Sequence, residues 1–360
     1  MAMHFTQSKK YRDLSLPAIS KITEEDAWQR FVIMRWGSLT TMPCPACGVV
    51  DEHYPRRTRR QWRCKHCNCV FSVTTDTPFA DRKLSFQQLL LIIYLFVVEP
   101  KGISANKHHA IVGVTLRTMY LNLQKIREAI FETMDLTPME GAVQIDGAHC
   151  CGKPRRHRRR KMEGESQMVN HKLRNRKASI DPTIQKQHMS PANRKRFKNR
   201  RIIIVFREIP GEPGKGAKRT ITKVVLTENQ KNVIQLVRKY VKPGSQIDTD
   251  GGVAFLSLIA WYDHRIVNHS IEYSTDDGIN NNQAESYISR LRRAEYGVYH
   301  GFRPQYLAFY AAEFAWREDV RRFTIREKLE NIFQKIFQCG ISYAFRRYSQ
   351  GHRLKMEYLG

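Results

Sequence analysis

The chain has 360 residues with 41% hydrophobic content, which is enough for two or three globular domains with real cores. Lys and Arg outnumber Asp and Glu by 61 to 34, and the resulting net charge of +27 requires a polyanionic partner, of which nucleic acid is the commonest. The longest apolar run, Leu89 to Val98, is too short to cross a membrane as a helix, and the N-terminus lacks the apolar segment of a signal peptide. These features exclude a membrane protein and predict a cytoplasmic one.

Residues 1–40 predict a helical lead-in. Thr23 is a good helix N-cap, with Asp26 three residues later. An apolar stripe at helical spacing follows, which indicates a core face and not a binding surface: Trp28, Phe31, Val32 and Trp36.

Residues 41–80 predict a zinc ribbon. Two CxxC pairs, Cys44 with Cys47 and Cys64 with Cys67, are separated by sixteen residues, the pattern of a tetrahedral structural Zn²⁺ site. Two disulfides are the alternative, which a cytosolic location disfavours. His66 and Cys69 lie close enough in sequence to substitute as ligands. The basic stretch 56–63 between the pairs suits phosphate contact, and a solvated loop is an equally fair interpretation.

Residues 81–135 predict a helix-turn-helix. A buried helix over Leu84 to Val98 ends at Pro100. A helix from Ile103 to Val112, a turn at Gly113 and a second helix from Thr115 to about Met134 follow. In such a motif the start of the second helix enters the major groove, which makes three residues the candidate DNA contacts: Thr115, Arg117 and Thr118.

The region 142–320 has the pattern of a mixed sheet with helices. Val143 to Ile145 reads as a buried strand that ends at Asp146 before Gly147. Two further strands, a crossover helix, the strand before Asp250 and a last strand are then expected in order: Arg201 to Phe206, Arg219 to Leu226, Glu228 to Tyr240, Ser245 to Thr249, and His264 to His269. This order predicts an α+β multidomain chain whose second half is ribonuclease H-like.

Polar side chains recur at a spacing of three or four from residue 282 onward, so that one helix face carries an amide, a carboxylate, a hydroxyl and a guanidinium: Asn282, Glu285, Ser289, Arg292 and Tyr296. A solvated, salt-bridged helix has the same pattern. Two carboxylates at strand ends and one on a helix can, however, converge on hard divalent cations.

Several stretches together resemble the DDE transposases of bacterial insertion sequences, in the group with an N-terminal zinc ribbon that is related to the Merlin elements: QIDGAHCCGK, DTDGGVAF, DHRIVNHS, NNQAESYISRLRRAEYGVYH and YLAFYAAEFAWR. With the ribbon, the resemblance covers most of residues 20–320. It implies that Asp146, Asp250 and Glu285 form the acidic triad, with Arg292 near the cleaved DNA.

The chain departs from that family pattern at two places. Part of the group has asparagine at the third position, so Asn282 is an alternative to Glu285, which we prefer because a carboxylate neutralises a divalent cation better. The family often has an acidic residue directly after the first aspartate, where this chain has Gly147.

A basic insertion, 153–200, interrupts the domain with 17 Lys or Arg against three acidic residues, and we expect it to be disordered without DNA and to act as a DNA clamp. The chain from Pro304 to about Gln338 should be helical, with four core aromatics: Phe309, Phe314, Trp316 and Phe323. Residues 321–360 are predicted to form a C-terminal helical tail.

The predicted function is a nucleoid-associated transposase that binds insertion-sequence ends and, with Mg²⁺ or Mn²⁺, cuts and joins DNA strands. Its partners would be double-stranded terminal repeats and target DNA, with further copies of the chain on that DNA. Two rivals remain: a DNA-binding regulator that never cuts, and a ribonuclease H-like metal nuclease that cuts without joining. His264, His269 and His300 are best interpreted as hydrogen-bonded histidines, because Mg²⁺ prefers oxygen ligands.

Overall fold

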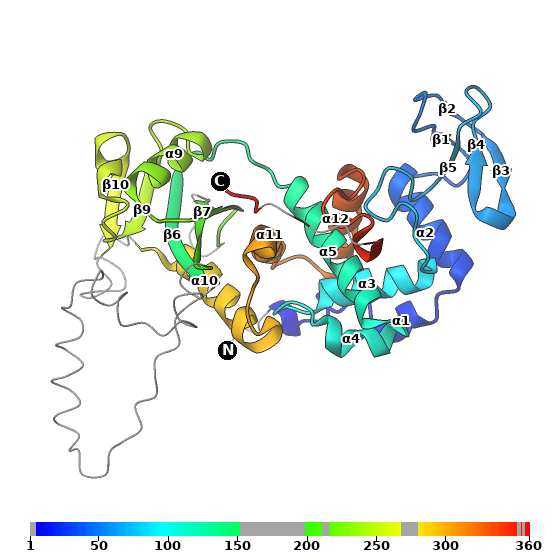
Figure 1. The fold of residues 1–360 in the computed structure, drawn as a ribbon, viewed down its shortest axis with the longest axis horizontal. Helices are drawn as coiled ribbons and strands as arrows, with labels where there is room; N and C mark the ends of the chain where they lie inside the picture. The colour runs from blue at the N-terminus through cyan, green and yellow to red at the C-terminus, as the bar shows by residue number, and fades with distance from the viewer. Residues whose placement is uncertain (1–4, 152–198, 211–215, 268–279, 351–353, 355–356) are drawn as a thin grey trace, which may run out of the picture.

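The structure is a computed structural model that describes residues 5–151, 199–210, 216–267, 280–350, 354 and 357–360. Figure 1 shows the cysteine-rich ribbon at one end, a mixed sheet at the other, and long helices between them. Most of the basic insertion, 153–198, and His269 lie outside the described residues. No helix in the described part is long and apolar enough to cross a membrane.

The lead-in is a short helix, α1 (Leu16–Ser20), followed by α2 (Glu24–Trp36). The Oγ1 of Thr23 accepts a hydrogen bond from the Asp26 N–H, which makes Thr23 the N-cap predicted from the sequence. Within the stripe, Phe31 and Val32 are fully buried. Trp28 stacks on Trp62 of the ribbon with ring centroids 5.6 Å apart, and Trp36 contacts the same ring edge-on at 5.4 Å. The lead-in therefore packs on the ribbon.

The ribbon consists of two small antiparallel sheets, one of two strands and one of three. Their strands are β1 (Met42–Pro43) with β2 (Val50–Asp51), and β3 (Tyr54–Arg56), β4 (Gln61–Arg63) and β5 (Val70–Ser72). Trp62 and Phe71 form the small core between the strands and α2.

Three helices follow the ribbon: α3 (Phe86–Val98), α4 (Ala105–Val112) and α5 (Leu116–Glu132). Ser85 and Gln88 form a capping box at the start of α3. Gly113 joins α4 to α5 with φ +71°, a left-handed conformation that glycine adopts without strain, and Thr115 caps α5. Helix, glycine turn and helix thus occur where the sequence predicts them.

The second half contains a five-stranded sheet of order β10-β9-β6-β7-β8. Its strands are β6 (Ala142–Cys150), β7 (Arg201–Ile209), β8 (Arg219–Val225), β9 (Gln246–Asp250) and β10 (Asp263–Val267). The first three pair antiparallel in succession, and β9 and β10 add on in parallel to the other side of β6. This is the ribonuclease H-like order expected from the sequence.

Helices cover both faces of the sheet, which explains why β7 is an almost uninterrupted apolar run. Ile202, Ile204 and Phe206 share a core with α9 (Gln230–Tyr240). Ile203 and Val205 share the other core with α10 (Asn282–Ala294) and α11 (Leu307–Asp319). Side chains alternate along a strand, so Asp146 lies on the α10 side of β6, in phase with Ala148.

The C-terminal region returns to the N-terminal half. Helix α12 (Ile325–Gln338) shares a core with α2, α3 and α5. Phe309, Phe314 and Trp316 are buried as predicted, but Phe323 is 40% exposed because it lies in the turn between α11 and α12. The prediction of a core role for Phe323 was wrong.

Several predicted boundaries differ from the structure, among them three in the second half of the chain. Strand β6 does not end at Asp146 but runs on to Cys150, because β7 pairs with it along its whole length. Helix α9 begins at Gln230 and not at Glu228, since Asn229 serves as its N-cap. Helix α10 ends at Ala294, and Tyr296 lies in the π-helical turn η4 (Glu295–Tyr299) that follows. Short 3-10 turns complete the described chain: η1 (Phe5–Gln7), η2 (Arg57–Arg59), η3 (Leu256–Ala260), η5 (Pro304–Tyr306) and η6 (Tyr348–Gln350).

Candidate functional site

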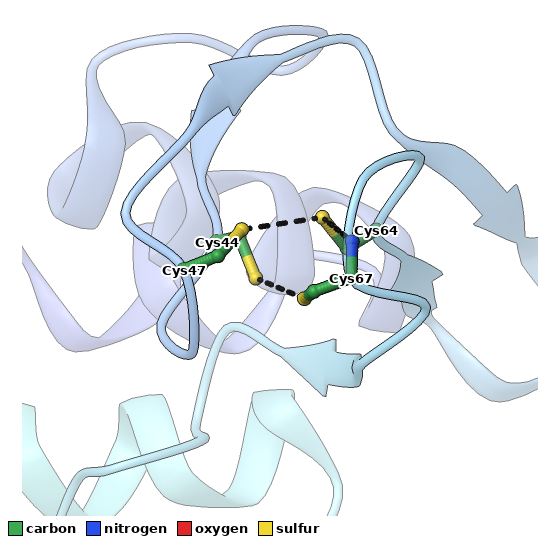
Figure 2. A group of neighbouring side chains, drawn as sticks. All are labelled: Cys44, Cys47, Cys64 and Cys67. Carbon is green, nitrogen blue, oxygen red and sulfur yellow. Dashed lines mark hydrogen bonds between the residues drawn. The ribbon is translucent and has the colours of Figure 1, made fainter.

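The four ribbon cysteines converge on one point, as Figure 2 shows. Their Sγ atoms all lie within 4.8 Å of one another, with 3.6 Å between Cys44 and Cys67 and 3.7 Å between Cys47 and Cys64. A tetrahedral Zn²⁺ with Zn–S bonds of about 2.3 Å places its sulfurs about 3.8 Å apart, so the donor set fits zinc. The site is structural, because all four positions are taken by protein thiolates.

The two other candidate zinc ligands are engaged elsewhere. The His66 Nε2 lies 3.1 Å from the Asp51 carboxylate, and the Cys69 thiol faces the Val70 carbonyl oxygen at 3.9 Å. Neither belongs to the four-sulfur group.

Asp146 and Asp250 are brought together by the parallel pairing of β6 with β9. The last pair in register is Ile145 with Thr249, so the two aspartates are the next residues on neighbouring strands. Beyond this point β9 ends while β6 continues beside β7. The sheet therefore opens where the two carboxylates lie.

Side-chain amides connect the N-terminus of α10 to strand β6. The Gln144 Oε1 accepts a 2.9 Å hydrogen bond from the Gln283 N–H, and its Nε2 donates to the Asn280 carbonyl oxygen at 2.5 Å. The Asn281 Nδ2 donates to the Ile145 carbonyl oxygen at 3.3 Å. These bonds hold the first turn of α10 beside Asp146, and Glu285 lies in that turn.

One cavity of about 1070 Å³ is lined by four of the five predicted catalytic residues. Its lining includes three carboxylates, from Asp146, Asp250 and Glu285, and three cations, from Lys101, Arg292 and Arg293. Gly147, Ile288, Ser289, Tyr296, Gly297 and Val298 complete the lining. A site with both carboxylates and cations can hold hard metal ions and a phosphate group together.

Asp146 is destabilised as an anion in this site. Burial raises its pKa to about 7, and the negative charge of Asp250 adds to the shift. Glu228 and Glu285 act in the same direction, while the Gly147 N–H, which donates to Asp146 Oδ1 at 2.6 Å, opposes it. A bound divalent cation would relieve this repulsion, and carboxylate oxygens are the ligands that hard cations prefer.

Glu228 is a fourth carboxylate that the sequence analysis did not single out. A Cβ at Gly147 would lie only 1.9 Å from the Glu228 Oε1, so the glycine leaves room for this side chain next to Asp146. The His149 Nε2 lies 3.3 Å from the Glu228 Oε2. The only sequence signal was indirect: glycine stands where the related transposases often carry an acid.

The remaining residues of the α10 face divide into two groups. Ser289, Arg292 and Tyr296 line the cavity with Glu285, and Tyr296 does so from the π-helical turn, a feature that often marks functional sites. Asn282 is the exposed first residue of α10 and is not among the described residues that line the cavity.

The three candidate DNA contacts lie at the exposed start of α5. Thr115 caps the helix through its bond from the Thr118 N–H, and Arg117 is exposed beside it. In the basic ribbon stretch, Arg60 instead forms ion pairs with Glu24 and Glu25, at 3.0 and 3.3 Å.

The histidines and thiols near the cavity have ordinary structural explanations. The His264 Nε2 lies 2.8 Å from the Thr249 hydroxyl, and burial lowers the pKa of this histidine. His300 is exposed, with a left-handed backbone (φ +55°) at the end of the π-helical turn. Cys150 and Cys151 are buried, and burial raises both thiol pKa values, which makes them poor nucleophiles.

A zinc ribbon, a helix-turn-helix and a ribonuclease H-like sheet with an acidic cavity together define the architecture of a DNA transposase. Comparison with family models agrees with it. Residues 138–319 match the ISXO2-like transposase domain, and residues 22–69 match the transposase zinc-ribbon domain. The first match covers half of the chain, which therefore belongs to the ISXO2-like transposase family. A search of curated proteins gave no match.

Proposed function

We propose that the protein binds the ends of an insertion sequence and catalyses metal-dependent DNA strand cleavage and strand transfer. The observation that carries this proposal is the convergence of Asp146, Asp250 and Glu285 on one cavity that also contains three cations. Neither a solvated helix nor a purely DNA-binding protein needs three carboxylates gathered against their mutual repulsion.

In this proposal Asp146, Asp250 and Glu285 hold Mg²⁺ or Mn²⁺ through their oxygens. Bound there, the metal would activate the attacking oxygen and stabilise the leaving oxygen of a phosphodiester. Arg292 binds a phosphate of the DNA end, because a guanidinium can hold a phosphate but not a cation.

The residues at the start of α5, Thr115, Arg117 and Thr118, contact the terminal repeat. Joining two element ends to a target requires more than one copy of the chain on the DNA.

The decisive experiment incubates the purified protein with labelled element-end duplex in Mg²⁺ or Mn²⁺ and scores nicked and joined products separately. We expect both products. A regulator would bind without producing either, and a simple nuclease would nick without joining. Asp250→Asn should abolish both products while leaving binding to element ends intact.

The third metal ligand is tested in the same assay. Glu285→Gln should abolish nicking and joining, while Asn282→Ala should leave both near normal. A double Asp146→Asn, Asp250→Asn variant should be scarcely worse than either single one, since losing one ligand already disrupts the metal site. The reverse pattern, with Asn282→Ala inactive and Glu285→Gln active, would transfer the ligand role to Asn282.

A further inference from the structure

One cation of the cavity comes from the other half of the chain. Lys101 lies in the loop between α3 and α4, whereas the other lining residues belong to the ribonuclease H-like domain. Lys101 is exposed, and the structure gives it no ion pair with any described carboxylate, although three carboxylates line the same cavity. Its ammonium group is thus placed at the acidic site without a protein counter-ion in the described chain.

The loop that carries Lys101 is fixed by Tyr299, the last residue of the π-helical turn. The Ile103 N–H donates to the Tyr299 hydroxyl at 3.1 Å. Gly102 has φ +87°, and a Cβ there would lie 2.2 Å from the same hydroxyl oxygen. Only glycine allows this approach, so the contact sets the position of the residue directly before it.

A buried ionic cluster holds Tyr299 in turn. Its hydroxyl accepts from the Arg127 Nη2 at 3.1 Å and can donate to the Glu313 carboxylate at 3.3 Å. Glu313 also binds the Arg127 Nε at 2.6 Å and the Arg317 Nε at 2.8 Å. Arg317 then donates to two carbonyl oxygens at the end of α3, those of Phe96 and Glu99. The loop is therefore anchored on both sides of Lys101.

We propose that Lys101 is a substrate-contacting residue whose ammonium group binds a backbone phosphate of the DNA end at the acidic cavity, with Tyr299 as its positioning residue. This inference rests on the proposed function. Lys101 stands four residues before α4, the first helix of the helix-turn-helix, so the DNA-binding half itself supplies a group to the cutting site. DNA bound by the helix-turn-helix would thereby be aligned with the three carboxylates.

The test is a thermodynamic cycle of DNA-binding affinities, which requires no cleavage of the DNA. Wild type and Lys101→Ala are titrated, in Ca²⁺, against element-end duplexes with either natural phosphates or one neutral methylphosphonate, moved stepwise across the terminus. Lys101→Ala should weaken binding to the natural duplex by about 10- to 100-fold, the value of a charge-assisted hydrogen bond. With the methylphosphonate at one position, wild type and Lys101→Ala should bind equally well, and this dependence is the coupling between Lys101 and that phosphate. An equal difference at every position would overturn the proposal.

Three variants serve as controls. Lys107→Ala removes an exposed lysine of α4 that does not line the cavity, so its effect should not be coupled to that same phosphate. Lys101→Arg should restore the coupling, because the charge is kept. Tyr299→Phe keeps the ring packed on Phe302 and Tyr310 but removes the hydroxyl, and should reduce the coupling in protein whose thermal melt shows it folded. Persistence of full coupling in folded Tyr299→Phe would contradict its positioning role.

The outcome separates this inference from the proposed function. A protein that shows the phosphate coupling but never nicks DNA would contradict the catalytic proposal and leave Lys101 as a DNA contact. A protein that nicks and joins normally with Lys101→Ala, and shows no coupling, would contradict only the role of Lys101.

Discussion

At the residue scale, Asp146 is the side chain whose chemistry depends most on its neighbours. It lies beside Asp250 by strand register, beside Glu285 through the Gln144 amide, and near Glu228 across Gly147. Burial and these charges together hold its pKa at about 7, well above the ordinary range of a carboxylic acid. Protons and metal ions should therefore compete for this group near neutral pH.

We predict that divalent metal affinity falls as the pH drops below about 7. Metal binding must displace a proton from Asp146 in that range, so the apparent affinity should fall by up to about tenfold per pH unit. Calorimetric titration with Mn²⁺ between pH 5.5 and 8.5 measures this. A constant affinity across that range would contradict the assignment of Asp146 as a ligand.

The same group affects the stability of the metal-free protein. Its pKa is higher in the folded than in the unfolded chain, so its stabilising effect is full below pH 4 and is lost as the pH rises through 7. Added metal should accordingly raise the melting temperature more at pH 8 than at pH 6. Asp146→Asn, which does not titrate, should lack this contribution to the pH dependence.

At the element scale, the ribbon is held together by its metal site and by Trp62. Its strands have two or three residues each, too short to be stable alone, and the thiolates supply the remaining constraint. Trp62 joins the ribbon to α2 through a stacked contact with Trp28 and an edge-on contact with Trp36. Loss of zinc should thus disturb the lead-in together with the ribbon.

Cys64→Ser should release the zinc and unfold residues near 40–75, with a change in tryptophan fluorescence, while the sheet of the second half stays folded. Metal analysis and hydrogen exchange check both parts. The matched control is Cys69→Ser, which lies outside the four-sulfur group and should retain one zinc per chain. An ordered, metal-free ribbon in Cys64→Ser would overturn the structural role of the site.

At the scale of the whole molecule, α5 and α11 join the two halves through buried charges. Glu313 is fully buried between Arg127 and Arg317, and both arginines lower its pKa against the effect of burial, which raises it. Because Trp316 of α11 and helix α12 also pack with α2, α3 and α5, one core cluster spans the boundary between the halves. We expect them to unfold together.

Glu313→Gln should destabilise the protein by about 3–5 kcal/mol, because it leaves two buried guanidinium groups without their carboxylate. Chemical denaturation should show a single transition shifted to lower denaturant in both near-UV and far-UV signals. The control is Glu140→Gln, which breaks an exposed pair with Lys242 and should cost less than about 1 kcal/mol. Two separate transitions would contradict the coupling of the halves.

Local patterns in the sequence were sufficient for the zinc ligands, the helix-turn-helix and the strand order. Each of these depends on short-range chemistry: thiol spacing, a glycine turn between two amphipathic helices, and apolar runs broken by turns. The proximity of the two aspartates was also predicted, but the parallel register of β6 with β9 produces it, because Asp146 lies within β6 and not at its end. Predicted boundaries were wrong where pairing with a strand distant in sequence set them. Strand β6, for example, continues past Asp146 because β7 pairs with it there.

Only the tertiary structure decided which other side chains join the carboxylates. Lys101 and Glu228 lie 45 residues before and 82 residues after Asp146, and no periodicity connects them to it. Lys101 reaches the cavity because a hydroxyl and an ionic cluster from the far end of the chain fix its loop. Glu228 comes close to Asp146, without lining that cavity, because Gly147 lacks a side chain. Such contacts depend on how whole layers pack, and a linear pattern of residue types does not encode that packing locally.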